Sequence, residues 1–105
     1  AGTDLHLPRA DAGAAPWRFS FLAGSGRAAP LTAALRAAGI DASNWYPALH
    51  RWYAAGRMQD EALFPHARRL TREIVNLWVE PRLTAADIAR ACTVIRSHLR
   101  LAVAA

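Results

Sequence analysis

The chain has 105 residues, of which 53% are hydrophobic and 20% are charged. This length allows one folded domain with a modest core, and the composition excludes a disordered chain. The formal net charge is +5, and all 13 basic residues are Arg. Because the sequence contains no Lys, its own residues cannot form a Schiff base or supply a P-loop lysine.

The chain carries no signal for a membrane or for export. It contains no run of about 18 apolar residues, and residues 1–15 lack the basic and apolar regions of a signal peptide. Cys92 is the single cysteine, so no internal disulfide can form. We therefore expect a reduced, cytoplasmic protein. The missing initiator Met fits a fragment or a processed chain.

The first predicted elements are a strand and a helix. The stretch "WRFSFLA" (17–23) alternates bulky with small or polar residues and ends at "GSG", which is typical of a strand followed by a turn. The stretch "RAAPLTAALRAAGI" (27–40) predicts a helix, with Pro30 at its first position and Gly39 at its C-terminal cap. Its predicted apolar face consists of Leu31, Leu35 and Ala38.

The middle of the chain predicts a strand, a helix and another strand. "DASNWY" (41–46) is a second strand ended by Pro47, and 48–58 is a short helix or a loop. Pro65 begins a helix, and "IVNLWV" (74–79) is a third strand. In that helix Ala67, Leu70 and Ile74 are expected to face inward, and Arg68, Arg69 and Arg72 outward.

The last predicted helix has the clearest signals. Thr84 and Asp87 form a T-x-x-D capping box, and the apolar stripe consists of Ile88, Cys92, Ile95 and Leu99. A helix-turn-helix would need a turn within "RACTV", which has no Gly and no break in the stripe. One continuous helix is therefore favoured, and DNA binding is a minor alternative.

The order of elements predicts an α+β fold. We expect a small two-layer sandwich, in which helices cover a mainly antiparallel sheet of about three strands, ending in a long C-terminal helix. Residues 1–15 are interpreted as a leader or linker, and 16–105 as the domain.

Most chemical motifs have a structural explanation that is simpler than a functional one. The four His residues lack metal-ligand spacing, so a zinc site is not expected. "GSGR" (24–27) is either a turn, which is favoured, or a phosphate cradle. Cys92 is predicted to be a buried structural thiol. The arginines at 68, 69 and 72 favour a solvated face over a phosphate or nucleic-acid surface.

The stretch "NWYPALHRWY" (44–53) has two interpretations. The first is that its aromatic residues, Trp45, Trp52 and Tyr53, pack in a core or interface, as most aromatic clusters do. The second is that a strand ending at Pro47 presents Asn44, Tyr46 and His50 at a cleft. The pattern alone favours packing.

The motifs taken together resemble a known family. They are Trp17-Arg18-Phe19, Leu35 with Gly39-Ile40, Tyr46-Pro47, Leu49-His50, Phe64-Pro65, Ala67 with Leu70 and Glu73, and Leu83-Thr84 with Asp87-Ile88. In this order, across residues 16–100, they resemble the C-terminal small domain of the DegT/StrS-type sugar aminotransferases. These are pyridoxal-phosphate-dependent enzymes of the aspartate-aminotransferase fold.

The resemblance implies a function for the whole enzyme and a role for this domain. The enzyme would move an amino group between glutamate or glutamine and a keto sugar, usually nucleotide-linked. The small domain would close one wall of the substrate cleft and pack on a large domain, usually in a homodimer. The resemblance places Asn44, Trp45, Tyr46 and His50 toward the cleft. It suggests that Arg18 either contacts an anion of the substrate or simply pairs with a carboxylate.

The chain also departs from the family pattern. Trp45 stands where the family usually has a His, and the large cofactor domain is absent from this sequence. Pyridoxal phosphate would therefore be bound by a large domain or by a separate chain, and not covalently by this chain, which is not expected to be catalytic alone. The alternative is a non-catalytic dimerisation or protein-interaction module derived from that domain. No membrane partner is expected, and nucleic acid is disfavoured.

Overall fold

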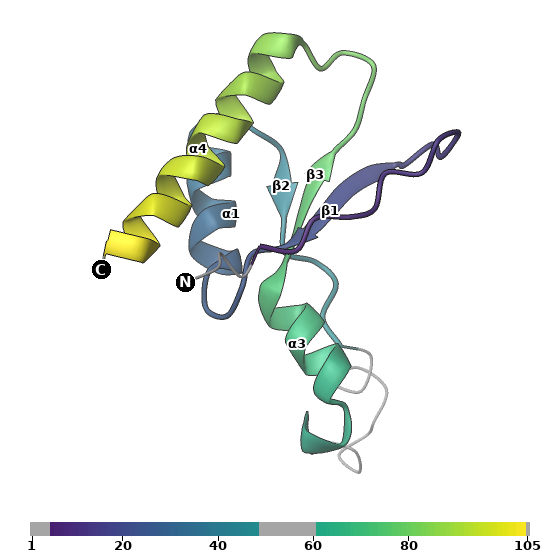
Figure 1. Cartoon of the computed structure of the whole chain (residues 1–105), viewed down its shortest axis with the longest axis vertical. Helices are drawn as coiled ribbons and strands as arrows, with labels where there is room; N and C mark the ends of the chain where they lie inside the picture. The colour runs from purple at the N-terminus through teal and green to yellow at the C-terminus, as the bar shows by residue number, and fades with distance from the viewer. Residues whose placement is uncertain (1–4, 49–60, 105) are drawn as a thin grey trace.

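The structure is a computed structural model that describes residues 5–48 and 61–104. In chain order they form strand β1 (Arg18–Leu22), helix α1 (Ala28–Ala37), strand β2 (Ala42–Ser43), 3-10 helix η1 (Glu61–Leu63), helix α3 (Pro65–Glu73), strand β3 (Ile74–Trp78) and helix α4 (Ala85–Ala104) (Figure 1). The predicted α+β fold with an antiparallel three-stranded sheet and a long C-terminal helix is confirmed. Within the described ranges, no helix is long and apolar enough to cross a bilayer.

The sheet has one apolar face and one polar and aromatic face. Its strand order is β1-β3-β2, and β3 pairs antiparallel with both neighbours. Phe21 lies opposite Val75, while Arg18 lies opposite Trp78 at the other end of the ladder. Since side chains alternate along a strand, Phe21 and Val75 point to one face, and Arg18 and Trp78 to the opposite face.

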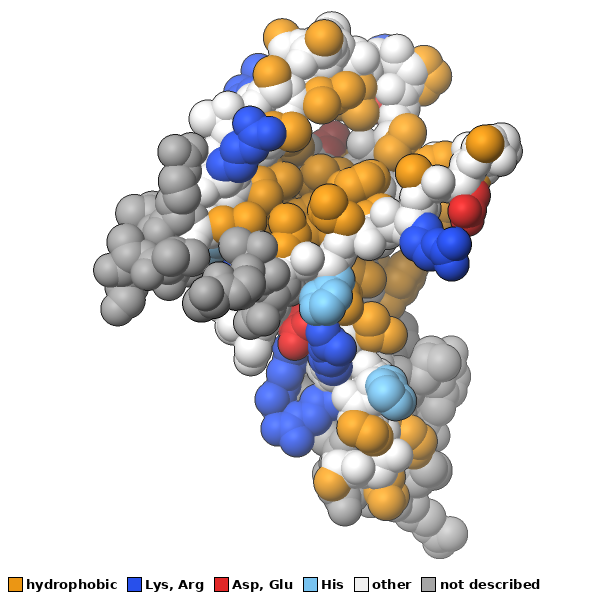
Figure 2. Space-filling model, viewed as in Figure 1, with side chains coloured by type: hydrophobic (Ala, Val, Ile, Leu, Met, Phe, Trp, Pro, Cys, Tyr) orange, Lys and Arg blue, Asp and Glu red, His pale blue; other side chains and the backbone are white. Residues whose placement is uncertain are grey.

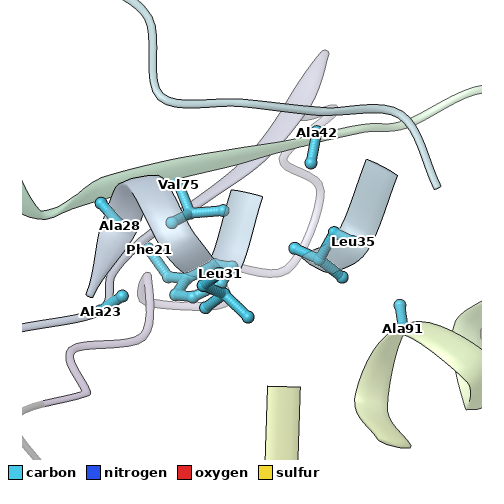
Figure 3. Packing of buried hydrophobic residues seen from close by; sticks show 8 residues of the cluster. All are labelled: Phe21, Ala23, Ala28, Leu31, Leu35, Ala42, Val75 and Ala91. Carbon is cyan, nitrogen blue, oxygen red and sulfur yellow. The ribbon is translucent and has the colours of Figure 1, made fainter. Parts of the chain in front are cut away.

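The core lies on the apolar face, under α1. Leu31 and Leu35 of α1 and Val75 of β3 are the largest fully buried side chains. Figure 3 shows them together with the rest of the buried cluster, which is completed by Phe21, Ala23, Ala28, Ala42 and Ala91. The small Ala91 is the contribution of α4, and α4 packs beside α1 (Figure 1). Burial of each large apolar side chain contributes about 2 kcal/mol.

Local signals explain where α1 ends. Gly39 has a φ of 77°, its N–H donates to the Arg36 carbonyl, and the Ile40 N–H donates to the Leu35 carbonyl. This is a Schellman motif, and it confirms the predicted glycine cap. The Arg36 side chain then donates to the Ala42 carbonyl at 2.8 Å, which joins the end of α1 to β2. The predicted start is wrong by two residues, because α1 begins at Ala28. Pro30 is tolerated there since amides of the first turn have no intrahelical partner.

The second strand is shorter than predicted. The sequence suggested 41–46, but β2 contains only Ala42 and Ser43. After Ser43, the chain leaves the ladder and its carbonyls bond to a side chain instead, because Asn76 Nδ2 donates to the carbonyl oxygens of Ser43 and Trp45. Of the segment 48–58, only Ala48 lies within the described residues.

The predicted inward stripes of the last two helices are partly wrong. On α3, Leu70 is 48% exposed, and Ile74 begins β3 instead of continuing the helix. On α4, Ile88 and Cys92 are exposed, so the prediction of a buried thiol is also wrong. The first turns of α4 project beyond α1 (Figure 1), which is the described element that α4 packs against most. The buried α4 positions are Ala91 and Leu99, with Val94 and Ile95 partly buried.

Two other expectations concern the ends of the domain. The prediction of one continuous last helix is confirmed, because α4 runs from Ala85 to Ala104 without a turn. The boundary at residue 16 stays a prediction. Within 1–15, His6 exchanges two backbone hydrogen bonds of 3.0 Å with Leu22, and Leu5 packs against the core.

Candidate substrate-binding surface

Aromatic side chains gather around one arginine on the polar face of the sheet. The guanidinium of Arg18 lies 4.1 Å from the ring centre of Trp17 and 4.0 Å from that of Trp78. It lies 5.7 Å from the ring of Tyr46, which in turn contacts Trp45 at 6.0 Å between ring centres. We call these five residues the arginine–aromatic cluster. Such cation–π contacts contribute about 0.5–1 kcal/mol each at exposed sites.

The pairing of β1 with β3 builds this cluster. Arg18 begins β1, Trp78 ends β3, and the antiparallel register places them opposite each other. Trp17 precedes β1 and meets Trp78 edge to face, with ring centres 6.5 Å apart. The guanidinium contacts both of these indole rings, and its buried Nε has no hydrogen-bond partner among the described residues.

Asn76 positions the loop that carries the other two rings. This residue is only 5% exposed, and its Oδ1 accepts a hydrogen bond of 2.6 Å from the Ser20 hydroxyl. Its Nδ2 donates to the carbonyls of Ser43 and Trp45. The Trp45 amide also donates to the Ser43 hydroxyl at 3.0 Å. This network fixes the backbone directly before Tyr46, at the edge of the polar face.

The cluster is open to solvent. Trp17 is 65% exposed and Tyr46 is 57% exposed, and Trp45 and Trp78 are also classed as exposed. Folded proteins seldom leave several large rings exposed together, and such patches commonly mark a surface that binds something. The cluster presents ring faces, one held cation and the phenol of Tyr46, which suits a ligand with a flat or apolar ring and a negative charge.

The five sequence-predicted site residues have different outcomes. Arg18, Trp45 and Tyr46 are brought together in the cluster. Asn44 is exposed in the same loop. His50 lies outside the described residues, as do Trp52 and Tyr53, which were interpreted as packing. Whether any of the five contacts a substrate stays a prediction.

Sequence reasoning did not find Trp17 and Trp78 as members of this surface. The available signal was their placement, since Trp17 stands at the start of the first predicted strand and Trp78 near the end of the third. Antiparallel pairing of those strands would have placed the two tryptophans together. The sequence of either strand alone does not indicate which strand it pairs with. Within the described ranges, no three His, Cys, Asp or Glu side chains lie close enough to hold a metal ion.

Comparison with known proteins gives one result that bears on identity. A search of curated proteins finds no match. The model of the DegT/DnrJ/EryC1/StrS aminotransferase family matches residues 4–96 of the 105, which spans the described strands and helices except the C-terminal part of α4. This chain therefore belongs to the DegT/DnrJ/EryC1/StrS aminotransferase family.

Proposed function

We propose that this chain is the small domain of a pyridoxal-phosphate-dependent aminotransferase that acts on a keto sugar, most simply a nucleotide-linked one. In this role the domain closes one wall of the substrate cleft. The observation that supports the proposal is the exposed arginine–aromatic cluster. It includes Trp45 and Tyr46, which the family resemblance places toward a cleft, and Arg18, which the resemblance suggests as an anion contact.

The cluster suggests a task for each group. Trp45 and Tyr46 offer ring faces on which the apolar side of a sugar or a planar base can stack. Arg18 offers a positive charge that is already held between two indoles, so little side-chain entropy is lost when an anion binds. Asn44, exposed in the same loop, offers a further hydrogen-bonding group. For His50, which lies outside the described residues, substrate contact is proposed from the family resemblance alone.

The cofactor does not fit this chain by itself. Pyridoxal phosphate, when bound, supplies the electron sink for amino-group transfer, and enzymes hold it through a Schiff base to a Lys. The sequence has no Lys, so this chain offers no side chain for that link. The proposal therefore requires a lysine-bearing large domain, either in the same polypeptide or in a separate chain, and most simply within a homodimer.

Reconstitution tests the proposal. The chain is mixed with a separately expressed, lysine-bearing large domain of the family, and glutamate-dependent amination of a nucleotide-linked keto sugar is measured. We expect activity only in the mixture. His50→Ala should raise KM by about tenfold through lost substrate contact, whereas His66→Ala, on the exposed surface of α3, should change nothing. Activity that the large domain shows equally well alone would contradict the proposal.

Borohydride trapping of the cofactor, read out by mass spectrometry, separates the role of this chain from that of the large domain. The chain alone is incubated with pyridoxal phosphate and then reduced with borohydride, and we expect no cofactor fixed to a side chain within this sequence. Mass spectrometry that finds the reduced cofactor on an internal residue would refute the claim that this chain is not catalytic alone.

A second candidate function rests on a different observation. Several large apolar side chains are exposed near α4 and the adjoining end of the sheet: Phe19, Val79, Leu83 and Ile88. Figure 2 shows apolar side chains gathered in the concavity between α4 and the β1–β3 pair. A non-catalytic module that dimerises or docks another protein would use such a surface.

Sedimentation at several concentrations distinguishes the two candidates. The interaction module predicts a stable homodimer that has no affinity for a lysine-bearing partner. The aminotransferase proposal predicts association with that partner, and a chain that stays monomeric until the partner is added would weaken the second candidate.

A further inference from the structure

Within the described residues, the outer edge of strand β1 is paired at Leu22 alone. Strand β1 lies at the edge of the sheet, and His6 exchanges two backbone hydrogen bonds of 3.0 Å with Leu22. If this antiparallel pairing continued, residue 8 would lie opposite Ser20. Residue 8 is Pro, which has no N–H to donate, so the pairing ends there. Residues 5–16 run from the Leu22 end of β1 back to its beginning (Figure 1), and we call this segment the strap.

The register of β1 on β3 shows which backbone groups face the outer edge. The Ala23 N–H donates to the Glu73 carbonyl, which continues the pairing of β1 with β3. Because hydrogen-bonded and non-hydrogen-bonded pairs alternate along an antiparallel ladder, every second residue of β1 directs its N–H and C=O away from β3. These residues are Arg18, Ser20 and Leu22. The backbone groups of the first two have no backbone partner among the described residues.

The strap is held mainly at its two ends. Leu5 packs against the core, and His6 makes the bridge to β1. At the other end the chain enters β1 through Trp17, which contacts the guanidinium of the next residue. Between these ends residues 7–16 are exposed. A segment with so few buried contacts separates from a fold more easily than a core strand does. The strap therefore covers the edge of β1 without pairing along it, which is one way in which proteins protect an edge strand.

The covered edge is complementary to a second copy of itself. If two β1 strands pair antiparallel about a two-fold axis at Ser20, each Ser20 faces the other, and Arg18 faces Leu22 of the second copy. Arg18 is the charged residue of β1, so no like charges lie opposite each other. On the apolar face Phe19, which is 39% exposed, would lie opposite Phe21 of the second copy. Aromatic pairs across two strands stabilise a sheet.

We propose that the strap is a detachable cover, and that a second copy of this chain replaces it on β1 once Leu5 and His6 leave their positions. The backbone groups of Leu22 then exchange His6 for Arg18 of the second copy, and those of Ser20 gain partners that the strap does not give them. The interface uses the backbone of β1, and not the side chains of the arginine–aromatic cluster or the exposed surface of α4. It does not depend on the proposed aminotransferase function.

Release of the strap by substitution tests the proposal. Leu5→Asp should expel the partly buried end of the strap, whereas Leu7→Asp adds the same charge to a side chain that is 64% exposed. Sedimentation at several concentrations should give a dimer dissociation constant at least about tenfold lower for Leu5→Asp than for the unchanged chain. Leu7→Asp should behave as the unchanged chain does. Equal association of the two variants, or none in Leu5→Asp, would overturn the proposal.

Two further substitutions identify the surface that pairs. In the released variant, Ser20→Lys would place two positive charges opposite each other at the two-fold axis and should restore the monomer. Ile88→Glu changes an exposed residue of α4 and should leave the dimer intact. The opposite pattern, in which Ile88→Glu abolishes the dimer and Ser20→Lys does not, would move the interface to α4 and refute the pairing of β1.

Amide hydrogen exchange tests the uncovered edge without relying on Leu5→Asp. In the dilute unchanged chain, the amides of Arg18 and Ser20 should exchange at least about tenfold faster than those of Phe19 and Phe21, which bond to β3. His6→Pro removes the N–H that donates to Leu22 and leaves the Leu5 side chain unchanged. In this variant, a rise in protein concentration should slow exchange at Arg18 and Ser20. Slow exchange at both residues in the dilute unchanged chain, or no change with concentration in His6→Pro, would contradict the proposal.

Discussion

Asn76 is a polar residue in an otherwise apolar strand, and its side chain joins three parts of the chain. It accepts from Ser20 on β1 and donates to the carbonyls of Ser43, at the end of β2, and of Trp45, in the loop that follows. Asn76→Leu would leave the partly buried Ser20 hydroxyl and two backbone carbonyls without these partners. We expect the free energy of unfolding to fall by about 1–3 kcal/mol, measured by urea denaturation.

Ser20→Ala serves as the control for this substitution. It removes one hydrogen bond of the Asn76 side chain and leaves the two that hold the loop. Its cost should therefore be smaller, about 1 kcal/mol. If Asn76→Leu costs no more than Ser20→Ala, the side chain does not hold the loop before Tyr46, and the position of the arginine–aromatic cluster would need another explanation.

At the scale of elements, the start of α4 is set by a reciprocal pair of hydrogen bonds. The Thr84 hydroxyl accepts from the Asp87 N–H at 3.2 Å, and the Asp87 carboxylate accepts from the Thr84 N–H at 2.9 Å. Thr84→Ala should lower the free energy of unfolding by about 1 kcal/mol, as measured by thermal or urea denaturation. Thr84→Ser keeps the hydroxyl and should be close to neutral, so an equal loss in both variants would contradict a capping role.

The same capping box predicts a pH dependence. Hydrogen bonds from the Thr84 hydroxyl and amide, with a further contribution from Arg90, hold the pKa of Asp87 below its ordinary value of 3.8. A lowered pKa in the folded state means that the carboxylate stabilises the fold above that ordinary value. This stabilisation is lost as the pH falls through the lowered pKa.

Comparison of the unchanged chain with Asp87→Asn isolates this effect. The unchanged chain should be the more stable of the two at neutral pH, and the difference should shrink as the pH falls below about 4. Denaturation curves at several pH values give the difference directly. A difference that stays constant down to the acid range would show that Asp87 does not titrate as a cap.

The elements also show which features a sequence can reveal. Three features were predicted correctly: the capping box of α4, the Gly39 cap of α1 and the start of α3 at Pro65. Each is set by residues that lie within a few positions of one another in the sequence. The predicted inward face of α4 was partly wrong, because the residues that are buried on this helix depend on where α1 lies. Periodicity identifies an amphipathic helix, but the neighbour decides which turns are covered.

At the scale of the whole molecule, the order of elements predicted the α+β architecture. The strand order β1-β3-β2 brings together the distant parts of the arginine–aromatic cluster. Arg18, Trp45 and Tyr46 were found from motifs along the chain. Trp17 and Trp78, the two indoles that contact Arg18, follow from the register of β1 on β3. Such long-range pairings have no local sequence signature, so no single segment predicts them.

Cys92 reports whether the outer surface of α4 is covered when the molecule is in solution. Its thiol is exposed, on the same helix as the exposed Ile88. In a dilute monomeric chain, a thiol reagent should react with it at a rate within about tenfold of the rate in denaturant, because exposure controls access to the thiolate. The reaction is followed by absorbance over a range of protein concentrations.

A native rate that is much slower, and that falls further as the protein concentration rises, would mean that a second copy covers α4. That result would favour the interaction module over a small domain that awaits its lysine-bearing partner, and Ile88→Glu should then restore the fast reaction by opposing burial of that surface.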